Sequence, residues 1–136
     1  MTDMNKGVLC TIDFSESSMD ALRMAMSLAQ LLKSPLTILY PYRLLNTHNG
    51  EATDLKKKIE ENAMRSFATL EKDILYGSDV SYEFKIEVGF ISDRVKDYAK
   101  KNSVSFLVMG NKMNLSNKES FDELAEHLQM PLVIVP

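Results

Sequence analysis

The sequence has a single cysteine, Cys10, and two histidines, His48 and His127, in 136 residues. One cysteine cannot form an internal disulfide, and it cannot by itself build a cysteine-based zinc site. The two histidines stand far apart in the chain, and neither has a helix-spaced partner that suggests a metal site. We therefore expect no disulfide and no metal, and cysteine usage of this kind fits the reducing cytoplasm. Cys10 itself lies inside an apolar run and is interpreted as a small buried hydrophobe.

An excess of basic charge is also absent, because 16 Lys and Arg residues face 19 Asp and Glu residues, for a net charge of -3. Such a chain has no bulk attraction for nucleic acid or for an anionic membrane surface. No stretch approaches the roughly 18 apolar residues that a membrane-spanning helix requires, and the first residues lack the apolar core of a secretory signal. Length and composition predict one soluble domain over residues 1–136, located in the cytoplasm.

The sequence does contain a regular alternation of short apolar runs and amphipathic segments. Five runs have the length and composition of strands: residues 7–12, 35–40, 81–88, 105–110 and 131–136. Four segments between them space their apolar residues as a helix does, near residues 15–32, 52–76, 92–99 and 116–128. Ser17 with Asp20 has the form of a capping box for the first helix, and Ser15 is the alternative cap.

A run of three lysines, Lys56, Lys57 and Lys58, lies near the start of the second helical segment. A basic run is one signal of phosphate binding, but Glu60 and Glu61 follow closely and balance the charge. We interpret the run as a solvated helix face.

Alternating strands and helices predict an open five-stranded parallel α/β sheet with helices on both faces, which is a Rossmann-like arrangement. Residues 81–88 alternate strictly between apolar and polar side chains, so this strand has one wet face and suits an edge of the sheet. The edge position favours the order 3-2-1-4-5, in which the third and fifth strands are outermost. The flavodoxin-like order 2-1-3-4-5 is the alternative.

In an open sheet of this kind, ligands bind beyond the carboxyl ends of the strands where the winding direction reverses. In the order 3-2-1-4-5 that place lies between the first and fourth strands, whose ends are Asp13 and Gly110. An acid there can bind ribose hydroxyls, and a glycine lets backbone N–H groups approach a phosphate. From spacing alone, a turn or helix-capping carboxylate is the more ordinary interpretation of Asp13, and a strand-end turn that of Gly110.

Three blocks carry a family resemblance: VLCTIDFSESSMDALRMAMSLAQLL near the start, SFLVMG in the fourth strand, and HLQMPLVIVP at the end. Together they resemble universal stress proteins over nearly the whole chain in length and element order, and the likeness is vague between about residues 45 and 80. The resemblance implies the 3-2-1-4-5 fold and commonly a homodimer. It also implies a choice, because some members of the family bind ATP and others do not.

ATP-binding members resemble one another in a loop of the form G-x-x-G-x9-G-[ST] after the fourth strand. Gly110 matches the first glycine, Asn111 follows it, and Met113 stands at the second glycine, where its side chain would occupy phosphate space. Lys118 and Glu119 fall about where the Gly-Ser pair would lie, and a glutamate there repels phosphate, although Lys112 and Lys118 partly offset it.

A second departure concerns the adenine contact, which the family makes through backbone groups just after the second strand. Pro41 falls at or beside that contact, and proline has no N–H to donate. Asp13 does match the family's ribose-contacting acid. We therefore expect a member that does not bind ATP, with no cofactor. The alternative is an adenine-nucleotide-binding member with a degenerate phosphate loop, which would take ATP with Mg²⁺ and turn it over slowly.

No catalytic residue is expected elsewhere in the chain. Ser15, Ser17 and Ser18 lie near Asp13, but no G-x-S-x-G elbow surrounds them, so a hydrolase triad has little support. The last apolar run has no gatekeeping charge along what would be an exposed sheet edge. We predict that the same strand of a second chain pairs with it, antiparallel, in a homodimer. The residues of this interface are Leu132, Val133, Ile134 and Val135.

Overall fold

The computed structural model describes residues 6–44, 51–113 and 121–136. Its elements alternate along the chain: β1 Gly7–Thr11, α1 Glu16–Leu32, β2 Leu36–Tyr42, α2 Glu51–Leu70, a π-helical segment η2 Glu71–Leu75, β3 Tyr82–Val88, α3 Ile91–Lys101, β4 Val104–Gly110, α4 Phe121–His127 and β5 Leu132–Val135. The five strands form one parallel sheet in the order β3-β2-β1-β4-β5. The predicted order is confirmed, and the order 2-1-3-4-5 is excluded.

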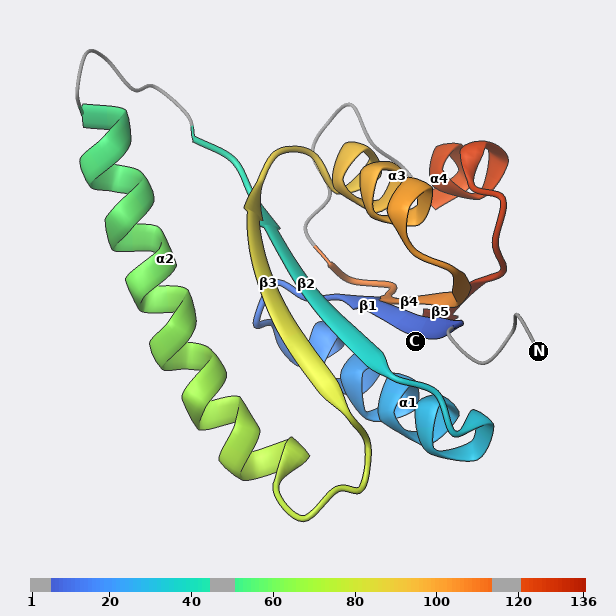
Figure 1. The fold of residues 1–136 in the computed structure, drawn as a ribbon. Coiled ribbons are helices and arrows are strands. Elements are labelled where there is room, and N and C mark those ends of the chain that lie inside the picture. The colour runs from blue at the N-terminus through green and yellow to red at the C-terminus, as the bar shows by residue number, and fades with distance from the viewer. Residues whose placement is uncertain (1–5, 45–50, 114–120) are drawn as a thin grey trace.

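Helices cover both faces of this sheet, α1 and α2 on one face and α3 and α4 on the other (Figure 1). The central strands contribute side chains to the hydrophobic core on both faces of the sheet. In β1, Val8 and Cys10 pack on the α1 side, and Leu9 between them packs on the α3 side. Strands buried on both faces explain the continuous apolar runs of the sequence. Cys10 is fully buried, and burial raises the pKa of its thiol, so the side chain stays uncharged. This agrees with its interpretation as a small buried hydrophobe.

The start of α1 differs from the capping box predicted from the sequence. Ser15, not Ser17, is the N-cap, and its side-chain oxygen accepts a hydrogen bond from the Ser18 backbone N–H at 3.3 Å. Ser15 takes this role because the Asp13 carboxylate already accepts the Ser15 N–H, which fixes the turn one residue before the helix. The sequence also has a pair of capping-box form before the last helix, Ser116 with Glu119, and it lies outside the described residues.

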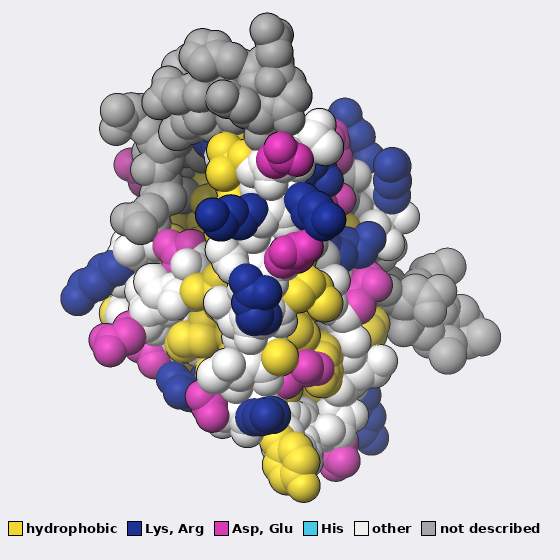
Figure 2. All heavy atoms as spheres, turned by 90° about the vertical axis from the view of Figure 1, so that its left-hand side faces the viewer, with side chains coloured by type: hydrophobic (Ala, Val, Ile, Leu, Met, Phe, Trp, Pro, Cys, Tyr) yellow, Lys and Arg dark blue, Asp and Glu magenta, His cyan; other side chains and the backbone are white. Residues whose placement is uncertain are grey.

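The outer face of α2 carries intermixed acidic and basic side chains (Figure 2). Lys56 forms an ion pair with Glu60 one turn along the helix, with 2.9 Å between the ammonium nitrogen and the carboxylate oxygen. Lys57 and Lys58 are exposed beside them. The lysine run is therefore part of a solvated face, as interpreted from the sequence.

Two tyrosines hold the inner side of α2 and η2 to the sheet. The Tyr42 hydroxyl of β2 donates a hydrogen bond of 2.6 Å to Glu60 of α2, and the Tyr82 hydroxyl of β3 donates one of the same length to Glu71 of η2. Between them the rings of Phe67 and Phe84 stack with their centroids 4.0 Å apart. The long helix is thus attached by an aromatic stack with a hydrogen bond to a carboxylate on either side of it.

These tyrosines predict an alkaline limit to stability. Burial together with the Glu60 hydrogen bond raises the pKa of Tyr42, and the Glu71 hydrogen bond raises the pKa of Tyr82. Because the folded-state pKa lies above the unfolded value of about 10, the contribution is complete below about pH 10 and is lost as pH rises through the folded-state pKa. We expect Tyr42→Phe to reduce the free energy of unfolding by about 1 kcal/mol at neutral pH.

The measurement is urea unfolding of the wild-type protein and of Tyr42→Phe at neutral pH and above pH 10. The difference between the two proteins should shrink at high pH, and Tyr76→Phe is the control because the Tyr76 side chain is 88% exposed. A Tyr42→Phe variant as stable as the control at neutral pH would show that the hydroxyl does not hold α2.

Candidate functional site

Asp13 lies two residues beyond β1, at the sheet end where the winding direction reverses between β1 and β4. Its carboxylate oxygen Oδ1 accepts a hydrogen bond of 3.0 Å from the Ser15 backbone N–H and another from the Ser15 hydroxyl. The Asp13 backbone N–H in turn donates to the Ser18 hydroxyl at 3.2 Å. Asp13 is therefore a half-buried turn carboxylate. Burial of the Tyr40 hydroxyl raises its pKa, and the negative charge of Asp13 raises this pKa further.

Phe14, between Asp13 and Ser15, adopts a left-handed backbone conformation with φ of 63°. Such a conformation is an outlier for a bulky side chain and persists only where the surroundings fix it. The Phe14 ring meets the Tyr40 ring edge to face with 5.0 Å between centroids, and it meets the Phe84 ring at 6.2 Å. Aromatic packing thus holds the turn that brings the Ser15 N–H onto Asp13.

Gly110 ends β4 against the first turn of α1. A Cβ atom at this position would lie 2.5 Å from the Ser17 carbonyl oxygen and closer still to the Ser17 hydroxyl oxygen. The Ser17 hydroxyl also accepts a hydrogen bond of 3.0 Å from the Lys112 backbone N–H. The glycine is therefore required for the close approach of strand and helix, which is a different reason from the strand-end turn expected from the sequence.

Met113 turns back into the molecule after β4. Its side chain is 6% exposed and belongs to the core layer of α3 and α4. The hydroxyl of Thr11, the last residue of β1, lies 3.9 Å from the Met113 sulfur and donates to it. The space beyond the ends of β1 and β4 is thus filled, on this face, by a thioether packed against a buried threonine.

Pro41 lies within β2 rather than after it, because the strand continues to Tyr42. Leu39 of the same strand accepts the Ile12 N–H at 2.9 Å, and backbone groups two residues apart point to the same side. Pro41 therefore faces the side of β1, where β1 has already ended at Thr11. The missing N–H removes no ladder bond from the sheet, and it removes a donor from the crevice.

The remaining predicted site residues are less closely associated with this place. Asn111 is exposed, and its backbone N–H donates to the Val135 carbonyl at 2.9 Å, which ties the end of β4 to β5. Lys118 and Glu119 lie outside the described residues, as does His48. His127 lines a cavity at the opposite end of the sheet. Over residues 6–44, 51–113 and 121–136, no three His, Cys, Asp or Glu side chains form a metal-binding group, and no helix is long and apolar enough to cross a membrane.

Sequence reasoning missed the role of Ser17 and the unusual backbone of Phe14. Ser17 looked like a helix cap, yet it forms the surface on which β4 ends. The role of Ser17 depends on its contact with Gly110, at the end of a strand that is distant in the chain. A single sequence does not show that these two residues are in contact. The left-handed backbone of Phe14 could not be predicted from the sequence around it, because residues in this conformation are usually Gly, Asn or Asp.

Comparisons with known proteins agree with this architecture. The chain matches the universal stress protein family over residues 4–136. No curated protein matches the sequence.

Among solved structures, the universal stress protein UspA from Lactobacillus plantarum superposes with a TM-score of 0.80 at 18% identity, covering 96% of this chain and 97% of that one. A universal stress protein in complex with cAMP gives a TM-score of 0.65 at 18% identity, covering 98% of each chain. One from Archaeoglobus fulgidus in complex with dAMP gives 0.66 at 14% identity, covering 98% and 99%. With a family match over nearly its whole length and the sheet order β3-β2-β1-β4-β5, the chain belongs to the universal stress protein family.

Proposed function

We propose that this protein is a non-catalytic, homodimeric regulator of the stress response whose crevice does not bind ATP. The observation that carries the proposal is Met113, buried against Thr11 at the place where a phosphate cradle needs a glycine and an open backbone. A side chain in van der Waals contact with the core cannot leave without opening a cavity there, which costs about 2–5 kcal/mol for a methionine. Nucleotide binding would have to offset this cost.

The proline in β2 supports the same proposal from the other side of the crevice. An adenine ring bound by backbone groups needs donors that face it, and Pro41 faces the crevice without one. An unpaired acceptor on a bound ligand loses the affinity of a hydrogen bond. On this proposal an adenine nucleotide would lack two of its contacts, one after β4 at Met113 and one within β2 at Pro41.

Absence of catalysis is proposed on the arrangement of the serines. Ser15 and Ser18 are both engaged in the turn around Asp13, through the helix cap and the Asp13 backbone N–H. His127 lines a cavity at the other end of the sheet and cannot serve these hydroxyls as a base. A buried free thiol at Cys10 fits a cytoplasmic setting.

A second candidate is binding of an adenosine monophosphate. Two relatives of the same fold are described in complex with cAMP and with dAMP, and a single phosphate needs less of a cradle than three. The half-buried carboxylate of Asp13, which matches the family's ribose-contacting acid in the sequence, would accept a hydrogen bond from a ribose hydroxyl. This candidate predicts affinity for the monophosphates that is independent of Mg²⁺.

The homodimer is proposed on the backbone of β5. The carbonyls of Pro131 and Val135 accept hydrogen bonds from Leu107 and Asn111 on the β4 side. Backbone groups alternate in direction along a strand, so those of Leu132 and Ile134 face away from β4. Within the described residues β5 is the outermost strand, so these groups have no strand partner there, and such an edge on an apolar strand favours pairing with another chain.

An apolar flank of α1 lies on the same side of the molecule. Met24, Leu28, Leu31 and Leu32 recur at helical spacing, and Met24, Leu31 and Leu32 are 42%, 79% and 47% exposed. The opposite flank of α1 faces α2, because Met19 and Arg23 line a cavity together with residues of α2 and η2. The apolar flank therefore faces the β5 edge, and antiparallel pairing of two β5 strands brings both α1 helices to the same face of one continuous sheet.

The first test is the ultraviolet spectrum of the purified protein. The chain has no tryptophan, so its own absorbance is low and a retained nucleotide would be conspicuous. We expect the ratio of absorbance at 260 nm to that at 280 nm to be that of free protein, and denatured protein to release no adenine compound on chromatography. Release of stoichiometric ATP would overturn the proposal, and release of a monophosphate would support the second candidate.

A further inference from the structure

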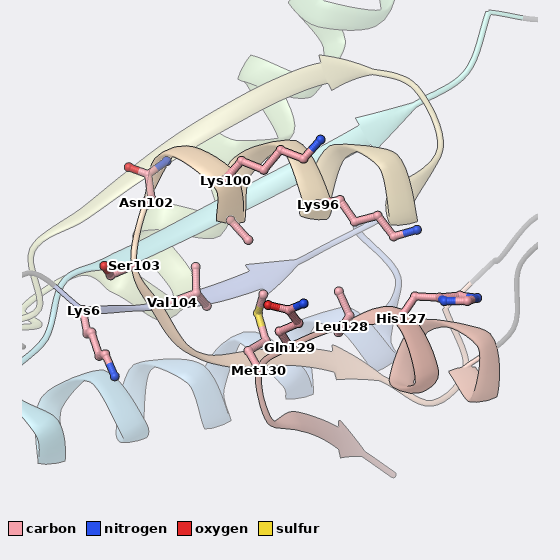
Figure 3. A pocket seen from close by; sticks show the side chains of 11 residues that line it. Lys6, Lys96, Lys100, Asn102, Ser103, Val104, His127, Leu128, Gln129 and Met130 are labelled. Carbon is pink, nitrogen blue, oxygen red and sulfur yellow. The ribbon is translucent and has the colours of Figure 1, made fainter.

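A cavity lies at the end of the sheet opposite to Asp13. It is an open cavity of about 540 Å³ between α3 and the segment that joins α4 to β5. Val104 begins β4, Lys6 precedes β1 and Met130 precedes β5, so the cavity adjoins the amino ends of these strands. Figure 3 shows Lys96 and His127 toward one end of it and Lys6 toward the other. Its volume is in the range of small-molecule sites.

The walls of this cavity are basic. Lys96 and Lys100 lie one turn apart on α3, and Lys6 and His127 contribute further nitrogen-bearing side chains from separate segments. Among the lining residues that the structure describes there is no aspartate or glutamate. Within the described ranges, no carboxylate lies within 4.0 Å of the Lys96 or Lys100 ammonium group, and neither lysine donates a hydrogen bond to a described partner. A chain with net charge of -3 thus gathers cationic side chains around one hollow.

The helix ends nearby do not cancel this charge. α3 ends at Lys101 and α4 at His127, so the cavity adjoins two helix carboxyl ends. Each such end carries about half a negative charge at most, and some of the last carbonyls are already bonded. The Tyr98 carbonyl accepts the backbone N–H and the side-chain amide of Asn102, and the Leu124 carbonyl accepts the Leu128 N–H. About one negative charge in partial dipoles faces the two lysines of α3, Lys96 and Lys100, so the cavity remains positive.

The floor of the cavity is apolar, and its rim offers amides. Ala99, Val104, Leu128 and Met130 supply aliphatic surface, while Asn102 and Gln129 carry side-chain amides. A binding site usually combines such a surface with a few polar groups that fix orientation. Inorganic phosphate would use the lysines and leave the floor uncovered, whereas an uncharged hydrocarbon would leave the lysines without a partner.

We propose that this cavity binds a small organic anion, a carboxylate, sulfonate or phosphate attached to an apolar group. The acidic group lies against Lys96 and Lys100 of α3, and the apolar group covers Val104, Leu128 and Met130. The site is separate from the Asp13 crevice and does not depend on whether that crevice holds a nucleotide. This site gives the protein a means of sensing a metabolite at the amino ends of the strands, whereas the sequence predicts a ligand beyond their carboxyl ends.

The test uses the fluorescent probe 8-anilinonaphthalene-1-sulfonate, which joins a sulfonate to aromatic rings. Titration of the folded protein should show one saturable site, and Lys96→Gln with Lys100→Gln should weaken the affinity about tenfold by removing two charge-assisted contacts. The matched control is Lys57→Gln with Lys58→Gln on α2, which removes the same charge from exposed helix positions. The control should bind within twofold of wild type, and thermal unfolding verifies that both variants are folded.

Two further arms separate the interpretations. Raising the salt concentration should weaken binding of the probe to wild type, because salt screens the attraction between the sulfonate and the lysines. The α3 variant lacks two of these lysines, so salt should affect its binding less. Excess ATP should not displace the probe from the cavity. Equal affinity of the α3 variant and the α2 control would overturn the proposal, as would an uncharged aromatic probe that binds wild type as tightly as the sulfonate.

Discussion

Replacing Gly110 by alanine is expected to destabilise the protein by about 3 kcal/mol, the upper end of the cost of overpacking a core. The new methyl group would lie 2.5 Å from the Ser17 carbonyl oxygen, a backbone atom that cannot rotate away. This steric clash can be relieved only if β4 and the first turn of α1 move apart. These two elements pack directly on one another at the centre of the fold. We expect the unfolding midpoint to fall by about 10 °C in a thermal scan.

Two variants isolate the cause of this loss. At Gly7 an added Cβ would lie 3.1 Å from the Pro35 carbonyl oxygen, so Gly7→Ala should cost clearly less than Gly110→Ala. Ser17→Ala removes the hydroxyl but leaves the carbonyl, so adding it to Gly110→Ala should restore only part of the stability. A Gly110→Ala protein within about 0.5 kcal/mol of wild type would contradict the close approach of strand and helix.

The packing requirement changes what Gly110 says about function. In the family resemblance this glycine opens a phosphate loop, yet here its position is explained by Ser17 alone. A glycine that packing requires would be present whether or not a nucleotide binds. The presence of Gly110 is therefore no evidence for nucleotide binding, and the residues on which the proposal rests are Met113 and Pro41.

Replacing Ile134 by proline is expected to halve the mass of the protein in solution. The Ile134 backbone faces away from β4, so proline leaves the β4 ladder intact and removes an N–H from the outer edge of β5. An isologous antiparallel contact would lose this hydrogen bond twice, once in each protomer. We expect wild type to sediment as a dimer and Ile134→Pro as a monomer at micromolar concentration.

The controls separate the edge from the core. Ile134→Val keeps the backbone donor and changes the side chain by one methylene, so it should remain dimeric. Met24→Lys changes a side chain that is 42% exposed on the α1 flank, so it should weaken the dimer while barely changing the stability of the fold. A monomeric wild type, or an Ile134→Pro protein that stays dimeric, would exclude the β5 interface.

The sheet order was predictable because it depends on patterns that one sequence displays. Continuous apolar runs mark the strands that are buried on both faces, and the alternation in residues 81–88 marks the outermost strand β3. Even there the polar face is not simply wet, because the Lys85 ammonium lies 5.6 Å from the Tyr98 ring centroid of α3. Strand ends were predicted less well, since β2 continues through Pro41 to Tyr42.

The candidate site was predictable in its place and less so in its contacts. Asp13 and Gly110 come from the general rule for open parallel sheets. The contacts that decide their roles join residues distant in sequence, namely Gly110 with Ser17 and Thr11 with Met113. The departures at Met113 and Pro41 were visible in the sequence, and the structure adds that the Met113 side chain is part of the core.

Isothermal titration calorimetry of the folded protein with ATP and Mg²⁺ tests most directly whether the Asp13 crevice holds ATP. We predict no binding heat corresponding to a dissociation constant below about 1 mM, for wild type and for Asp13→Ala alike. A micromolar dissociation constant in wild type that is lost in Asp13→Ala would contradict the account, because it would show that a nucleotide binds despite Met113 and Pro41.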